Sequence, residues 1–204
     1  MGLKNYDGGK YISILNGKIC QRVPDTTEGA IQRTNKLGKV VYEKFYDSFV
    51  GKLVDIKTVD TPYGKSWMFD FIDGKEIYHL QLSYSNSFAK MILKMLPNID
   101  VTKEIKLSPQ IKEVDGKNKS SIFINQDGVS IKHAYTREVP NGLPQMKQVK
   151  VAGNLVWDDT EALEFLEAMV KADILPKLDR IETQTSDGSI DDIKIENEGS
   201  EDPF

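Results

Sequence analysis

The chain has 204 residues, of which 39% are hydrophobic and 28% charged, and its formal net charge is −4. This length suits one globular domain with flanking segments, and no apolar run is long enough to span a membrane. The single cysteine excludes an internal disulfide, and with only two histidines beside it a structural zinc site is not expected. We therefore expect a cytoplasmic protein without a secretory signal.

The N-terminal part predicts a hairpin followed by an arm. Residues 10–23 alternate between apolar and polar side chains around Asn16-Gly17, a pair typical of a type I′ turn. Residues 24–39 are polar and contain glycines, which indicates a long loop or arm with basic side chains. Residues 40–49 are aromatic-rich and fit either a strand or one helical turn.

The next stretch predicts three consecutive antiparallel strands, because short β-rich or alternating segments are separated by turn residues. Pro62 and Gly64 mark the first turn, and Asp73-Gly74 marks the second. The three expected strands are residues 50–59, 66–72 and 75–82.

The pattern then changes to helical spacing. Residues 85–96 place apolar side chains three and four positions apart, with Ser85 or Asn86 as the N-cap and Pro97 as the stop. The chain returns to strand character at residues 101–116 and 120–138.

The C-terminal part predicts an irregular segment, a helix and a tail. Residues 139–157 are rich in proline and glycine, and residues 158–178 form a second helix capped by Asp159 or Thr160. Beyond Asp179 the chain is polar and acidic, so we expect disorder.

Three strands, a helix and two strands follow one another in the order of an OB-fold, a five-stranded Greek-key barrel with a helix between strands 3 and 4. An SH3-like barrel is the main alternative. We expect a mainly β protein in four parts: an N-terminal hairpin and basic arm (1–49), the barrel (50–138), a connecting segment with the C-terminal helix (139–178) and the acidic tail (179–204).

Motifs of catalysis are missing from the sequence, so we expect neither an enzyme nor a cofactor or metal. Asp55 and Asp70 would be the carboxylates of a metal-dependent nuclease or nucleotidyl transferase. Cys20 and His133 would be a nucleophilic pair, although a lone strand cysteine is typical of a core.

Basic and aromatic residues recur where an oligonucleotide groove would lie in such a barrel, on the strand 2–3 face and in the 1–2 and 4–5 loops. Single strands are held by such grooves, with cations on phosphates and rings stacked on bases. The candidate contacts with single-stranded nucleic acid are Arg33, Lys36, Lys39, Lys52, Lys57, Tyr63, Lys65, Trp67, His79, Tyr84, Lys132, Tyr135 and Arg137.

Charge is distributed unevenly along the chain. Residues 182–204 carry eight acids and one lysine, a net charge of −7, whereas residues 1–181 carry +3. A basic body attracts polyanions, and an acidic tail can compete for the same surface. The chain ends in Asp-Pro-Phe, an apolar ring on a charged tether.

The strand order, the acidic segment and the last residues together resemble the single-stranded DNA-binding proteins of bacteria and their phages. The residues that match the family's tip are Glu201, Asp202, Pro203 and Phe204. Residues 29–67 further look like phage-encoded members of the group. The linker is shorter than in the family, and the C-terminal helix lies outside a minimal OB module, so a monomer, a dimer or a larger homo-oligomer stays open.

The resemblance implies binding of single-stranded DNA without sequence specificity, in the host cytoplasm for a phage protein. It further implies that the tip recruits proteins of replication, recombination and repair, with the ring in an apolar pocket and the carboxylates on basic residues. The alternative function is a structural or adaptor module whose barrel binds protein.

Overall fold

The computed structural model describes residues 9–35, 38–151 and 154–179, and this part of the chain is mainly β. The strands are β1 (Lys10–Leu15), β2 (Lys18–Arg22), β3 (Ile31–Thr34), β4 (Val40–Tyr46), β5 (Phe49–Thr61), β6 (Gly64–Asp73), β7 (Glu76–Ser83), β8 (Glu104–Val114), β9 (Lys117–Gln126), β10 (Val129–Ser130), β11 (Lys147–Val151) and β12 (Asn154–Asp158). The helices are α1 (Ser87–Met95) and α2 (Thr160–Met169), and short turns follow them at η1 (Leu96–Asn98), η2 (Val170–Ile174) and η3 (Leu175–Lys177).

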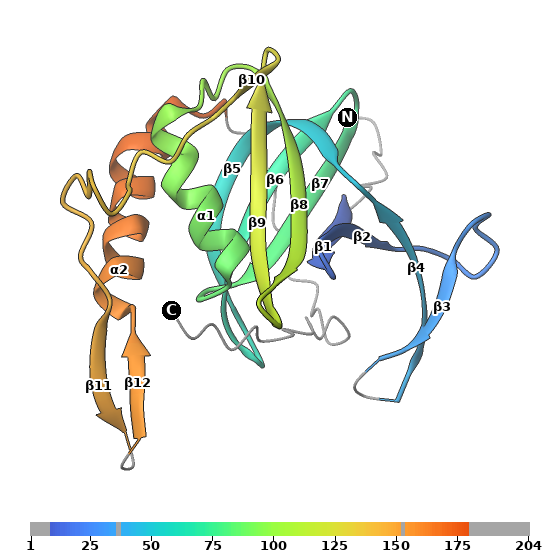
Figure 1. Ribbon diagram of the computed structural model, residues 1–204. Coiled ribbons are helices and arrows are strands. Elements are labelled where there is room, and N and C mark those ends of the chain that lie inside the picture. Colours follow the sequence, from blue (N-terminus) through green and yellow to red (C-terminus); the bar gives the residue numbers. More distant parts are fainter. Residues whose placement is uncertain (1–8, 36–37, 152–153, 180–204) are drawn as a thin grey trace.

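Ten strands form one mixed sheet in the order β10-β9-β8-β5-β6-β7-β1-β2-β4-β3. The sheet is strongly curved, and its strands are labelled in Figure 1. Neighbouring strands are antiparallel except β1 and β7, which run parallel. The N-terminal strands therefore extend the same sheet as the central strands, and β11 and β12 form a second sheet of their own.

The long strand β5 changes partner along its length. Its first residues pair with β8, and from Lys52 onward it pairs with β6, with a register shift between Leu53 and Asp55. A bulge of this kind bends and twists a strand. The bend lets β5 turn over at the top of the molecule, so that the β5–β6 and β8–β9 hairpins both point downward in Figure 1.

The closed five-stranded barrel expected from the sequence is not formed. Closure would require β7 to pair with β9, but β7 pairs with β1 and β9 pairs with β10. The N-terminal hairpin has taken the free edge of β7, which local sequence patterns do not indicate.

The turn of the β1–β2 hairpin lies against β8. Asn16 and Gly17 both have positive φ, as the type I′ prediction requires. A Cβ on Gly17 would lie 2.4 Å from the backbone nitrogen of Ile111, so only glycine permits this approach.

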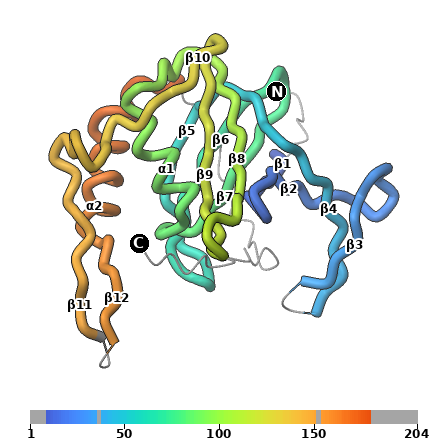
Figure 2. The backbone as a smooth tube through the Cα atoms, viewed as in Figure 1, coloured from blue at the N-terminus to red at the C-terminus, as the bar shows by residue number. Residues whose placement is uncertain are grey.

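The core lies between the curved sheet and the two helices. Trp67, Phe69 and Phe71 of β6 are at most 1% exposed and belong to one apolar cluster with α1, β8, β9 and α2. Helix α1 packs against β9, and α2 lies next to α1 (Figure 2). The sequence-based assignment of both helices is confirmed.

The helix caps differ from each other. The Asn86 side chain accepts hydrogen bonds from the backbone N–H groups of Phe88 and Ala89, as predicted. Asp159 makes no side-chain cap on α2; instead, Asp158 accepts from the Thr160 backbone N–H at 3.0 Å and hydroxyl at 2.6 Å.

Two segments depart from the sequence prediction. Residues 131–138 leave the sheet, and the Ala134 backbone N–H donates to the Lys94 carbonyl of α1 at 2.8 Å. Residues 147–157, expected to be irregular, and Asp158, expected to begin the second helix, form the β11–β12 hairpin apart from its turn at 152–153, which lies outside the described residues. Within the described ranges, each helix falls short of the length and apolar character needed to cross a membrane.

Candidate nucleic-acid interface

The β5–β6 hairpin carries the first group of sequence-predicted contacts. Tyr63 lies at its tip and is 56% exposed. Lys65 forms an ion pair with Glu167 of α2 at 2.6 Å and lies 4.4 Å from the centroid of the Tyr84 ring. The positive charge of Lys65 is therefore already matched by a carboxylate.

Trp67 is 1% exposed, which corrects the prediction that its ring stacks on bases. The ring stacks instead on Tyr84, with centroids 5.4 Å apart and planes 9° apart, and its Nε1 donates to the Tyr84 carbonyl at 3.2 Å. The period-2 alternation of β6 places Trp67 on the same side as Phe69 and Phe71, so it belongs to the core.

The Glu167 carboxylate joins α2 to the hairpin. It accepts hydrogen bonds from Lys65, from the Tyr84 hydroxyl at 2.7 Å and from Lys171 at 2.8 Å. Burial alone would raise the pKa of Glu167, but these three hydrogen bonds outweigh it and lower the pKa to about 2. Tyr84 is half-buried, and its hydroxyl connects the sheet to α2 through the hydrogen bond to Glu167. Burial and this hydrogen bond raise the pKa of Tyr84.

A charged network lies on the other face of the central strands. Asp70 is 3% exposed and binds Lys57 Nζ at 2.7 Å and His79 Nδ1 at 2.6 Å. Burial raises the pKa of Asp70, but the hydrogen bonds from His79 and Lys57 outweigh it and hold the pKa below its usual range. Both oxygens of this carboxylate are engaged by protein groups.

His79 is 8% exposed, so its prediction as a nucleic-acid contact is also corrected. Its ring lies 4.9 Å from that of Tyr11, which pairing with β7 brings beside it. In the part of the chain that the structure describes, three or more His, Cys, Asp or Glu side chains nowhere gather as metal ligands.

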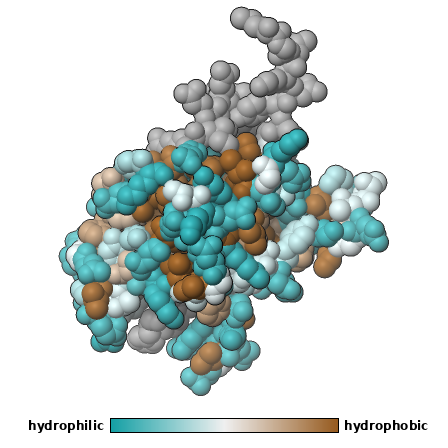
Figure 3. Space-filling view, turned by 90° about the horizontal axis from the view of Figure 1, so that it is seen from above, coloured by the Kyte–Doolittle hydropathy of each residue, from teal (hydrophilic) through white to brown (hydrophobic). Residues whose placement is uncertain are grey.

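The remaining predicted contacts are scattered. Arg33 on β3 forms a two-pronged ion pair with Glu43 at 2.8 and 2.9 Å, and Lys52 pairs with Asp179 at 2.7 Å. Lys39 is exposed on the β3–β4 arm, whose apolar side chains stand out at the right of Figure 3. Lys36 lies outside the described residues.

The segment after β10 holds the last three predicted contacts. Lys132 and Arg137 are exposed, whereas Tyr135 is half-buried with its ring edge-to-face against Phe165 at 5.6 Å. The predicted tip, residues 201–204, lies outside the described residues. The structure thus brings Lys65 and Tyr84 together beside α2, whereas Lys57 lies on the opposite face of the central strands and the arm and this segment lie elsewhere.

The structure shows a basic surface that the sequence prediction missed. The register of β8 and β9 pairs Lys112 with Lys119 and Ser108 with Phe123, so these side chains share the outward face of the hairpin. This β8–β9 outer face contains four lysines, one phenylalanine and no acid: Lys106, Ser108, Gln110, Lys112, Val114, Lys117, Lys119, Ser121, Phe123 and Asn125.

The side chains on the β8–β9 outer face are open to solvent. Phe123 is 44% exposed, and Lys106, Lys112 and Lys119 are exposed without an ion-pair partner among the residues described. Of the acids of this hairpin, Glu113 lies on the opposite face and Asp115 in the turn, whereas Glu104, the first residue of β8, continues the outer face beyond Lys106. The sequence signal was the alternation on either side of Asp115-Gly116.

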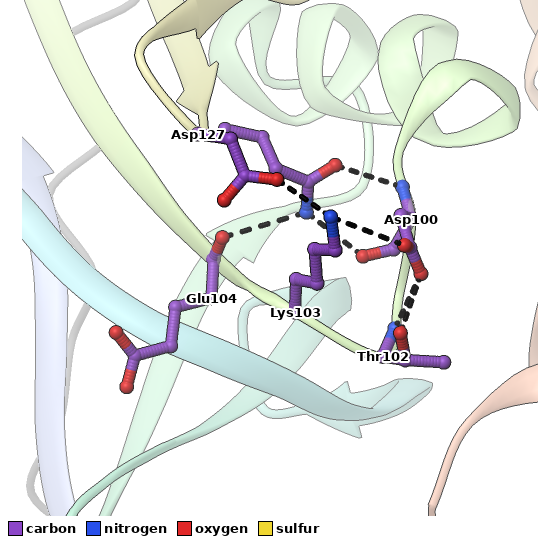
Figure 4. Close-up of polar contacts among 6 residues, drawn as sticks. Asp100, Thr102, Lys103, Glu104 and Asp127 are labelled. Atoms are coloured by element: carbon purple, nitrogen blue, oxygen red, sulfur yellow. Dashed lines mark hydrogen bonds and ion pairs between the residues drawn. The ribbon is translucent and has the colours of Figure 1, made fainter.

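The base of this hairpin is fixed by polar contacts, shown in Figure 4. Gln126 is 8% exposed; it accepts from the Asp100 backbone N–H at 3.0 Å and donates to the Asp100 carbonyl at 2.8 Å. Lys103 pairs with Asp127 at 2.6 Å, and Asp100 binds the Thr102 hydroxyl at 2.7 Å. The segment that leads into β8 is thus tied to the end of β9.

Comparison of the chain with protein-family models, curated proteins and solved structures finds no match.

Proposed function

We propose that this protein binds single-stranded DNA without sequence specificity. The β8–β9 outer face carries the proposal, because it combines the exposed ring of Phe123 with Lys112 and Lys119, which lie opposite each other and away from Glu104 at the start of β8. Lysines on phosphates supply affinity that does not depend on sequence, and a ring accepts any base.

The connectivity of the central strands supports the same proposal. Strands β5, β6 and β7, helix α1 and strands β8 and β9 follow in the order of an OB-fold, and β5 pairs with both β6 and β8 as that fold requires. We propose that this part is an open variant of that fold. The β5–β6 and β8–β9 connections would then be the loops that frame an oligonucleotide site, with Tyr63 on one of them.

A salt titration tests the function. Labelled oligo-dT is titrated with the full chain at several salt concentrations, and duplex DNA of equal length serves as the control. We expect binding to single strands whose log K falls linearly with log salt, because each phosphate contact releases counterions. Failure to bind oligo-dT at low salt, or an affinity that does not change with salt concentration, contradicts the proposal and favours a protein-binding adaptor. Competition with oligo-U separates DNA from RNA preference.

The same proposal includes recruitment of replication, recombination or repair proteins through residues 201–204. Its support is the sequence alone. An aromatic ring that is buried on binding supplies affinity for the partner, and carboxylates steer the encounter with basic residues on it. Deleting residues 196–204 should preserve or raise the affinity for oligo-dT, because a competing acidic segment is lost, and should abolish partner capture. Weaker DNA binding after the deletion would contradict this part.

A further inference from the structure

The β11–β12 hairpin, here called the ribbon, stands apart from the main sheet. Its strands pair only with each other, and it projects from the body just before α2 (Figure 1). Lys147 holds its base through hydrogen bonds to Glu161 at 2.6 and 2.8 Å. A lone two-stranded hairpin is marginally stable in water, so a ribbon with large exposed side chains calls for an explanation.

The register of the ribbon gives its two faces different compositions. Gln148 lies opposite Trp157 and Lys150 opposite Leu155, so these four side chains share what we call the tryptophan face. Trp157 is 45% exposed and Leu155 67%. The other face holds the Val149–Val156 and Lys147–Asp158 pairs.

Charge distinguishes the tryptophan face from an ordinary apolar patch. Lys150 is exposed and has no ion-pair partner among the residues described. The tryptophan face contains no acid, because Asp158 lies on the other face and there binds Thr160. The Trp157 ring, the Lys150 cation and the Gln148 amide on one face suit single-stranded nucleic acid, whose bases can stack on the ring and whose phosphates attract the cation.

We propose that the tryptophan face is a second contact for single-stranded nucleic acid, with Trp157 stacked on an unpaired base and Lys150 on a phosphate. This inference rests on the proposed function and extends it to an element outside the five-stranded core. Stacking reads no hydrogen-bond pattern, so the ribbon adds affinity without adding sequence preference. It also gives the exposed ring a partner that the hairpin itself does not supply.

Fluorescence tests the inference, because the two tryptophans of this chain differ in exposure. Trp67 is buried and Trp157 is exposed, so the difference between wild type and Trp157→Phe isolates the signal of the ribbon without altering the core. We expect oligo-dT to quench wild-type emission and to leave that of Trp157→Phe nearly unchanged.

Affinity supplies the second readout. Trp157→Ala should weaken oligo-dT binding roughly 5- to 150-fold, the range that corresponds to loss of one stacked base. Lys150→Glu should weaken it and reduce its salt dependence. Val156→Thr on the opposite face keeps the β-branched shape and serves as the matched control, with affinity near wild type.

The outcomes separate this inference from the proposed function. If wild type binds oligo-dT but Trp157 is silent and Trp157→Ala binds normally, the ribbon inference is overturned and the function stands. If the full chain does not bind oligo-dT, both are overturned. If Trp157→Ala changes only the sedimentation coefficient, the ribbon is a contact between protein copies, which also overturns the inference.

Discussion

The central strands and the β8–β9 outer face both carry lysines and aromatic rings, but they use them differently. On the central strands Lys57 and Lys65 are each paired with a buried or half-buried carboxylate, and Trp67 is covered. On the outer face Lys112 lies opposite Lys119, neither has an ion-pair partner among the described residues, and Phe123 is exposed. The first arrangement stabilises the fold, and the second leaves charge and ring for a ligand.

Residue type alone therefore does not define a binding surface. A lysine contributes to polyanion binding only where its charge is not already matched by a nearby carboxylate. Variants of the central strands should therefore lose stability, whereas variants of the β8–β9 outer face should lose affinity for nucleic acid.

The largest expected effect on stability is at Trp67. Replacing it with alanine should lower the free energy of unfolding by about 3–5 kcal/mol, because a buried indole leaves a cavity. Phe123→Ala, the matched change on the outer face, should alter it by about 0.5 kcal/mol or less. Urea unfolding of both variants measures this contrast, and equal losses would remove the distinction between the regions.

Asp70→Asn should have the next largest effect. The change removes the negative charge that holds Lys57 and His79, at a cost of about 1–3 kcal/mol for weakened hydrogen bonds to charged groups. Urea unfolding at neutral pH measures the loss, while oligo-dT affinity should stay near wild type. A stable variant with impaired DNA binding would instead place this network in the binding site.

The pH dependence of Glu167 gives a smaller effect with a defined window. Its pKa is about 2 in the folded chain, below the ordinary value of 4.5, so its contribution is complete above pH 4.5. The contribution is lost as pH falls from about 4.5 towards 2. Glu167→Gln should flatten the dependence of unfolding free energy on pH in this range, and an unchanged slope would show that Glu167 does not contribute.

The local parts of the fold could be predicted from the sequence. The turns at Asn16-Gly17 and Asp73-Gly74 and the helix capped by Asn86 follow from chemistry within a few residues. The open barrel could not, because it depends on β1 pairing with β7 across a long stretch of chain. The ribbon was missed because proline and glycine before it outweighed the alternation within it.

The candidate site was predictable only in part for the same reason. Tyr63 follows from its place in a turn, but the partner of Lys65 is Glu167, 102 positions away. Trp67 lies next to an exposed turn in the sequence and yet points inward with the alternation of β6. Pairing and burial of this kind are tertiary properties.

The most direct test of the account is the oligo-dT affinity of two charge-reversed variants. One is Lys112→Glu with Lys119→Glu on the outer face; the other is Lys75→Glu with Lys177→Glu, exposed lysines elsewhere that change the net charge equally. We expect the first to lose about tenfold or more in affinity and to lower the salt slope by about 1.4, and the control to bind nearly as wild type does. Equal losses in both variants, or none in the first, would contradict the assignment of the β8–β9 outer face.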